Sequence, residues 1–208
     1  IWFGMLAGLA SFDGNELQLY MVDDGLISDE IYTICYDTHN QLWIGTNNGL
    51  SCFDGKNFVN FTTKDGLSNN NIHSIQEDTK GRLWIATEDG VSLYDGRGFI
   101  TFVTQDGLSH NRVGAIHQDH SNAIWFGTYR GGIARYDENT LINFTTQDGL
   151  IHNTIRSINE EPDGLLWFGT NGGLTNYDGH HFKSFYFNNE LSNAWITSLY
   201  RTSNGMLW

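Results

Sequence analysis

The chain has 208 residues, of which 39% are hydrophobic and 14% aromatic, enough for a substantial core. Its formal net charge of -13 argues against nucleic acid or an anionic lipid surface as a partner, because both need a basic footprint. The two cysteines, Cys35 and Cys52, form no CxxC spacing, so neither a zinc site nor a disulfide framework is indicated. We also expect no other metal site and no cofactor. There is no run of about 18 apolar residues, and we expect no membrane insertion by this segment.

The sequence repeats with a period of about 41 residues. Each copy opens with an apolar residue, Trp, an apolar residue and then Gly or Ala. The steps between successive tryptophans of this pattern are 41, 41, 41, 42 and 41 residues, and a sixth copy begins at Leu207. An internal repeat of this length indicates stacked units of one architecture.

One unit, residues 70–107, shows how each copy is built. Apolar stretches separated by turn residues predict four strands, at 72–77, 83–87, 91–94 and 99–104. Asp95-Gly96 is typical of a tight hairpin, because Gly tolerates positive φ. No stretch carries a helical pattern over three turns, and Gly occurs 24 times. Four strands per unit at this period predict an all-β fold, the β-propeller, with one blade per unit.

Comparison of all units places the first strand of each at about 31–36, 72–77, 113–118, 155–160 and 196–201. The chain starts with a second strand and ends with a first strand. We therefore predict a single domain, 1–208, of five four-stranded antiparallel blades, closed by a 3+1 blade that joins the N-terminal three strands to the C-terminal strand. In this arrangement Met206-Leu207-Trp208 would duplicate Ile1-Trp2, so one tryptophan is surplus. This leaves open an alternative, in which the chain is a fragment that pairs with another chain.

The recurring strings Leu-Trp-Ile-Gly-Thr-x-x-Gly-Leu, Tyr/Phe-Asp-Gly, Phe-x-x-Phe-Thr and Asp-Gly-Leu-Ser-x-Asn resemble the two-component-regulator propeller repeat, over essentially the whole chain. This repeat occurs in the periplasmic sensor regions of bacterial hybrid histidine kinases. The resemblance implies a segment of a longer, membrane-anchored signalling protein, on the periplasmic or extracellular side of a bacterial inner membrane. It implies output domains in the same polypeptide and, as a further partner, a second copy in a homodimer.

Most repeated residues are expected to be structural. The tryptophans fill the wedge between neighbouring sheets, at about 1.5–3 kcal/mol of burial each; they are Trp2, Trp43, Trp84, Trp125 and Trp167. The Asp-Gly pairs form turns, and Asp137-Glu138 is the one departure from that pattern. Stacking of a carbohydrate on these tryptophans is the less favoured interpretation.

A ligand breaks the symmetry of a repeat, so the candidate site lies where the units differ. The loop before the first strand and the loop after the second strand fall on the same face, and one position inside the first strand varies near the mouth of the central channel. These positions supply guanidinium groups, amides and aromatic rings, which suit a polar ligand. The predicted ligand-binding residues are Tyr32, His73, Arg112, Arg130, Arg156, Glu88, His110, Tyr129, His152 and Trp195. The competing interpretation is that loops vary because nothing constrains them.

The leading hypothesis is a non-enzymatic sensor propeller that binds a small polar or oligosaccharide ligand at this loop face. A lyase or hydrolase that uses His110, Arg112 and His152 is a second hypothesis, but no nucleophile, base and orienting residue can be linked by spacing, so no catalytic residue is assigned. A protein-interaction scaffold is the third.

Overall fold

The computed structural model describes residues 1–185, 195–202, 206 and 208. Its internal contacts divide the chain into two compact parts, each larger than one repeat, which are described separately below. We call them unit 1 (Ile1–Phe102) and unit 2 (Val103–Trp208). The prediction of one domain over 1–208 therefore stays a prediction. Within the described ranges, no helix is long and apolar enough to cross a membrane.

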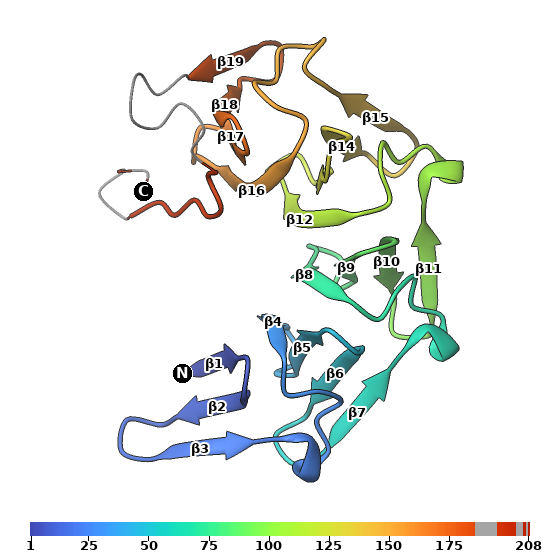
Figure 1. Cartoon of the computed structure of the whole chain (residues 1–208), viewed down its shortest axis with the longest axis vertical. Coiled ribbons are helices and arrows are strands. Elements are labelled where there is room, and N and C mark those ends of the chain that lie inside the picture. The colour runs from blue at the N-terminus through green and yellow to red at the C-terminus, as the bar shows by residue number, and fades with distance from the viewer. Residues whose placement is uncertain (186–194, 203–205, 207) are drawn as a thin grey trace. The chain divides into compact units, whose positions relative to one another are not determined.

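The first unit contains three antiparallel sheets (Figure 1). The N-terminal sheet has three strands, β1 (Trp2–Met5), β2 (Gly8–Phe12) and β3 (Leu17–Tyr20). The second has four strands, β4 (Ile31–Tyr36), β5 (Leu42–Thr46), β6 (Leu50–Phe53) and β7 (Phe58–Phe61). The third has β8 (Ile72–Glu77), β9 (Leu83–Thr87), β10 (Gly90–Tyr94) and β11 (Phe99–Phe102).

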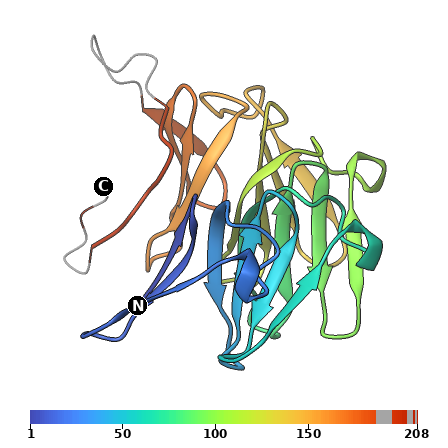
Figure 2. The ribbon, with the colours of Figure 1, turned by 60° about the horizontal axis from the view of Figure 1, so that its bottom comes forward.

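The second unit contains two four-stranded antiparallel sheets with the same strand order. One has β12 (Val113–Gln118), β13 (Ile124–Thr128), β14 (Ile133–Tyr136) and β15 (Leu141–Phe144). The other has β16 (Ile155–Glu160), β17 (Leu166–Thr170), β18 (Gly173–Tyr177) and β19 (Phe182–Phe185). One three-stranded and four four-stranded sheets follow the predicted division of the repeats. Figure 2 shows the strands of each sheet from the side.

Short 3-10 turns follow β3, β7 and β11; they are η1 (Val22–Asp24), η2 (Thr63–Asp65) and η3 (Thr104–Asp106). The sequence predicted that the strand beginning at Phe99 runs to Thr104, but it ends at Phe102. The carboxylate of Asp106 accepts a hydrogen bond from the Val103 amide at 2.9 Å, and Gly107 adopts φ 102°, so the chain turns there. Each sheet connection repeats this Asp-Gly turn.

The apolar core lies between neighbouring sheets of a unit. In the first unit, Leu9 of β2 packs in one cluster with Ile44 of β5 and Phe53 of β6. In the second unit, Trp125 of β13 packs with Phe168 of β17. Trp43, Trp84 and Trp125 are buried, and the other two blade tryptophans, Trp2 and Trp167, are partly buried. Alternation along each strand supplies apolar side chains to both faces.

Each buried indole has an acidic hydrogen-bond partner that the sequence interpretation did not identify. The Nε1 atom of each tryptophan donates to a carboxylate six residues earlier, at 2.7 to 2.9 Å, in the pairs Trp43–Asp37, Trp84–Asp78, Trp125–Asp119 and Trp167–Glu161. In the three aspartates, the other carboxylate oxygen accepts backbone amides of the turn between the first and second strands. The acidic residue therefore fixes the turn and satisfies the indole at once.

The predicted last strand, 196–201, does not form a regular strand in the described residues. Tyr200 and Trp208 instead exchange two backbone hydrogen bonds, at 3.0 and 2.8 Å. This pairing matches the register of the complete sheets, such as Asn159 opposite Trp167. The surplus tryptophan thus pairs as the second strand of a new copy. The predicted closing contact with the first sheet would join the two units, and it stays a prediction.

Candidate functional site

Each sheet has two ends, which the strand register defines. At one end, the loop before the first strand meets the loop after the second strand, and we call this the loop end. At the opposite end, the first strand turns into the second strand, and we call this the turn end. In unit 2, the amide of Tyr129 donates to the carbonyl of Arg112 at 2.9 Å, so these two loops are bonded directly. All ten predicted ligand-binding residues lie in loop-end segments.

The variable position inside the first strand is the site of a β-bulge in all four four-stranded sheets. The ladder is interrupted at residues Tyr32, His73, Gly114 and Arg156. A bulge leaves one residue outside the ladder and redirects its side chain. The bulge therefore explains why this position varies while both of its neighbours are packed.

In unit 1, the predicted site residues face carboxylates. The Tyr32 hydroxyl donates to Glu30 at 3.3 Å, and the side-chain amide of Asn47 donates to the same carboxylate at 2.7 Å. Desolvation, and then the Glu30 charge, raises the pKa of Tyr32 above its usual value. Nε2 of His73 lies 2.9 Å from the Glu88 carboxylate. The loop end of unit 1 is therefore an acidic network in which the polar groups satisfy one another.

In unit 2, the loop after β13 is one residue longer than its counterparts. The Thr128 hydroxyl donates to the carbonyl of Gly132, four residues on, whereas the equivalent Thr46 and Thr87 donate three residues on. This insertion accounts for the single step of 42 residues in the repeat. It places Arg130 at φ 72°, a left-handed conformation that costs a non-glycine residue roughly 1 kcal/mol or more.

The longer loop builds a cluster of cations around one aromatic ring. The guanidinium carbon of Arg112 lies 4.8 Å from the centroid of the Tyr129 ring, and that of Arg130 lies 5.0 Å from it. His110 contacts the same ring edge-on at 6.3 Å. A guanidinium over an aromatic ring is held in place without losing its hydrogen-bond donors. We call these four residues the Tyr129 cluster.

The two histidines at the loop end of unit 2 also have a structural role. Nδ1 of His110 accepts the Arg112 amide at 3.0 Å, and Nδ1 of His152 accepts the Thr154 amide at 2.9 Å. In unit 1, Asn69 caps the equivalent turn through its side-chain oxygen. Because Nδ1 accepts, the neutral ring carries its proton on Nε2. The imidazoles are therefore donors toward a ligand.

Arg156, the bulge residue of the last sheet, lies between an amide and an indole. Its Nε donates to the side-chain oxygen of Asn171 at 2.8 Å, and its guanidinium lies 5.2 Å from the ring of Trp195, which is 64% exposed. Among the described residues, neither Arg130 nor Arg156 has a carboxylate within ion-pair distance. These two guanidinium groups keep donors for a ligand.

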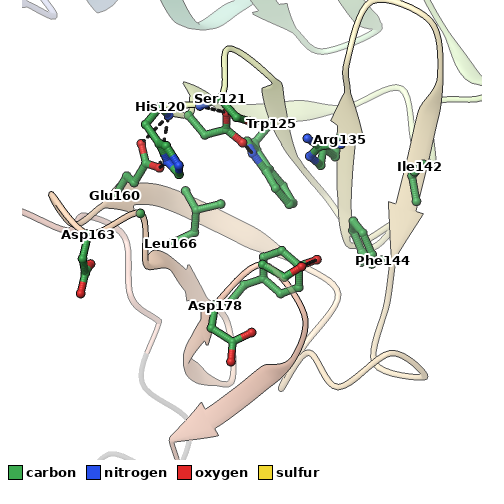
Figure 3. Close-up of a pocket in the computed structure, with 14 residues that line it drawn as sticks. His120, Ser121, Trp125, Arg135, Ile142, Phe144, Glu160, Asp163, Leu166 and Asp178 are labelled. Atoms are coloured by element: carbon green, nitrogen blue, oxygen red, sulfur yellow. Dashed lines mark hydrogen bonds and ion pairs between the residues drawn. The ribbon is translucent and has the colours of Figure 1, made fainter.

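A cleft at the turn end of unit 2 was not predicted. It has a volume of about 510 Å³ and lies between the sheet of β12–β15 and that of β16–β19. Figure 3 shows Trp125 and Arg135 on one side, with His120 hydrogen-bonded to Glu160 on the other. None of the ten predicted residues lines this cleft. Unit 1 has a smaller counterpart of about 380 Å³, lined by Trp43 and Tyr94 among others.

The repeat did contain a signal for this cleft. The residue opposite the tryptophan on the third strand differs in every sheet and is Ser11, Cys52, Leu93, Arg135 or Asn176. The sequence alone does not mark this position as part of a cleft, because a residue that varies inside a strand also fits a packing position. In the described part of the chain, no group of three or more His, Cys, Asp or Glu side chains is arranged to hold a metal ion.

Comparison with known families identifies the repeat. The model for the two component regulator propeller matches residues 25–48, 66–89, 107–130 and 149–172, each of which runs from the Asp-Gly turn through the second strand. The chain contains two component regulator propeller repeats at these four places. This confirms the resemblance read from the sequence. No curated protein matches the chain significantly.

Solved structures share the fold. The extracellular domain of the hybrid two component system BT3049 from B. thetaiotaomicron matches with TM-score 0.84 at 23% identity, over 99% of this chain and 30% of that one. The corresponding domain of BT4673 from the same organism matches with TM-score 0.73 at 22% identity, over 100% and 38%. Virginiamycin B lyase from Staphylococcus aureus matches with TM-score 0.72 at 15% identity, over 96% and 75%. These likenesses confirm the predicted β-propeller fold, and the chain spans less than two fifths of either Bacteroides domain.

Proposed function

We propose that the two component regulator propeller repeats of this chain form a ligand sensor in a bacterial, membrane-anchored signalling protein, on the extracellular or periplasmic side. Two observations support this role. The repeat family is that of two-component regulators, and the structures of similar fold include extracellular domains of hybrid two component systems. Output domains in the same polypeptide would then carry the signal onward.

The ligand site that we propose is the loop end of unit 2. The observation that carries it is the pair of arginines, Arg130 and Arg156, whose guanidinium groups lie against aromatic rings and have no carboxylate partner in the described residues. Guanidinium groups without a carboxylate partner are notable in a chain of net charge -13, which has many more acidic than basic side chains. Such groups are positioned to bind oxygen-rich ligands. The strained backbone of Arg130 supports the same conclusion, because strain gathers at binding sites. The ligand is a small polar or saccharide molecule.

The enzyme hypothesis is less well supported. A lyase would need a histidine that can remove a proton, but Nδ1 of both His110 and His152 already accepts a backbone amide. Likeness in fold to virginiamycin B lyase does not carry its chemistry, because function belongs to the site. We therefore favour a sensor without catalytic activity.

A thermal-shift screen of the 208-residue chain against neutral and acidic oligosaccharides tests the proposal. We expect at least one compound to raise Tm in a saturable way. Arg130→Ala and Arg156→Gln should each weaken this binding about tenfold or more, because each removes charge-assisted hydrogen bonds. Arg97→Gln, in an exposed turn, is the matched control and should have no effect. Binding that survives both loop-end substitutions would place the site elsewhere.

Signalling is tested separately, in a full-length polypeptide that contains this chain. The compound found above should change the output activity of the wild-type protein, and Arg156→Gln should shift that response to higher concentration. A response that is identical in wild type and in the variant would contradict the loop-end site as the origin of the signal.

A further inference from the structure

The turn-end cleft of unit 2, shown in Figure 3, contains an arginine with unused donors. Arg135 lies on β14, directly opposite Trp125 in the ladder, and its guanidinium carbon is 5.7 Å from the indole centroid. The side chain is only 28% exposed. In the described part of the chain it makes no hydrogen bond, and the carboxylate of Asp137, at 4.0 Å, is too far to accept one.

A half-buried guanidinium without an acceptor is unusual. It carries five N–H donors, and each donor removed from water without a partner costs free energy. Stacking on Trp125 holds the group in one orientation, so a ligand that binds it loses little side-chain entropy. The equivalent positions of unit 1 are occupied by Cys52 and Leu93, which have no such donors. Among the four four-stranded sheets, only β14 therefore has an arginine opposite the tryptophan.

The rest of the cleft offers an apolar surface of ring size. Phe144 stacks on Trp125 with centroids 6.0 Å apart, and Tyr177 meets Trp125 edge-on at 5.7 Å. Leu166 and the exposed Ile142 complete this wall. The Tyr177 hydroxyl already donates to the carbonyl of Gly179 at 2.8 Å, so the ring presents its apolar surface. A volume of about 510 Å³ lies in the range of small-molecule sites, roughly 300–1,000 Å³.

The charges around the cleft restrict the kind of anion. Glu160 is hydrogen-bonded to His120 at 2.5 Å, and Asp119 is occupied by Trp125 and its turn. In Figure 3, Asp163 and Asp178 lie across the cleft from Arg135. So many acidic groups would repel a doubly charged phosphate, whereas a singly charged, planar carboxylate matches the guanidinium fork.

We infer that the turn-end cleft of unit 2 is a second binding site, distinct from the loop-end site, for a small carboxylate whose ring-sized body packs on Ile142, Phe144 and Tyr177 while Arg135 binds the carboxylate. Two sources share this chemistry, a uronic acid from an acidic saccharide and an aromatic carboxylic acid. The inference does not depend on the function proposed for the loop end.

Binding is measured on the 208-residue chain by two-dimensional NMR of the arginine Nε–H groups. The probes are two matched pairs, benzoate with benzamide and glucuronate with glucose. We expect one acid to shift the Arg135 signal in a saturable way while its neutral partner binds at least tenfold more weakly, because only the acid pairs with the fork. Which acid binds more tightly separates the two sources.

Arg135→Gln should weaken binding of the preferred acid at least tenfold, and Arg135→Lys should recover only part of the loss, because an ammonium lacks the planar fork. Arg97→Gln, with the same change of charge in an exposed turn, is the control and should leave binding unchanged. The inference would be overturned by any of three results. These are equal binding of an acid and its neutral partner, binding that survives Arg135→Gln, and no saturable binding of either acid. The comparison of probes on the wild-type chain decides the matter even if a variant fails to fold.

Discussion

The indole of Trp125 donates its Nε1 hydrogen to Oδ2 of Asp119 at 2.7 Å, inside a blade whose other side chains are mostly apolar. The second oxygen of Asp119 accepts the amides of Ser121 and Ala123, which form the turn between β12 and β13. One carboxylate thus joins the turn to the core. Asp37 and Asp78 make the same arrangement in unit 1, so the bond is part of the repeat.

Removal of this carboxylate should be strongly destabilising. Asp119→Ala leaves the buried indole N–H and two turn amides without acceptors, and we expect a loss of about 2–4 kcal/mol in the free energy of unfolding. Asp119→Asn keeps the turn acceptor but turns an amide donor toward Trp125, so its loss should be smaller. Urea denaturation measures both. A loss below that of the exposed control Asp163→Ala would contradict the role assigned to the bond.

The same carboxylates predict how stability depends on pH. Burial alone would raise the pKa of Asp119, but hydrogen bonds from Ser121, Trp125 and Ala123 outweigh it and lower the pKa below its usual value. The pKa of Asp78 is lowered in the same way, against burial, by bonds from Arg82 and Trp84. A carboxyl group whose pKa is lower in the folded state than in the unfolded state stabilises the folded protein. This stabilisation is complete at pH values above the unfolded-state pKa, about 3.9, and is lost as the pH falls through the folded-state pKa.

We therefore expect Tm to fall as the pH is lowered below about 4. Asp119→Asn should flatten this acid limb, because the variant has no proton to take up at that position. An acid limb of unchanged slope in the variant would show that other groups control the transition.

The one turn that departs from Asp-Gly offers a test of backbone strain. Glu138 adopts φ 76°, where the equivalent Gly55, Gly96 and Gly179 adopt 96°, 87° and 93°. Glu138→Gly should stabilise the chain by about 0.5–1 kcal/mol, because glycine reaches this region without a Cβ clash. Thermal unfolding at neutral pH measures the change. Glu138→Ala is the control, since it removes the charge and keeps the Cβ, and should show no gain.

Close packing requires a glycine at position 45, two residues after Trp43 in the second strand. A Cβ on Gly45 would lie 2.6 Å from Cγ2 of both Ile72 and Thr33, and both side chains are β-branched and stiff. Gly45→Ala should cost about 1–3 kcal/mol. The paired position in the next sheet carries Ala86 opposite the smaller Ser74. Thr33→Ser should therefore recover part of the loss in the double variant, and additive losses would argue against the clash.

The loop histidines allow structural and binding roles to be separated. His110→Asn should leave stability within about 0.5 kcal/mol of wild type, because Asn69 caps the equivalent turn in unit 1. His110→Ala should cost about 0.5–2 kcal/mol, as loss of a side-chain cap does. Denaturant unfolding measures both variants. Equal stability of the Asn and Ala variants would mean that the cap contributes nothing.

The repeat, the all-β propeller fold and most strand bounds could be predicted from the sequence, because its period, its Gly-rich turns and its alternating apolar residues are local signals. It also pointed to the loop end, and the loops of unit 2 do bring Arg112, Tyr129 and Arg130 together. Which polar side chains already have hydrogen-bond partners within the protein is visible only in the folded chain. Asp119 pairs with an indole six residues on, and Nδ1 of His110 caps a turn, so neither side chain is free in the way its type suggests.

The cleft around Arg135 shows the same limit from the other side. Its variation was visible beside an invariant tryptophan, yet the pattern of strand residues alone describes it as one more packing position. What makes it different is that two sheets leave about 510 Å³ between them at that end, with no acceptor for the guanidinium among the described residues. Volume and hydrogen-bond satisfaction arise from residues distant in sequence, and therefore only the folded chain reveals them.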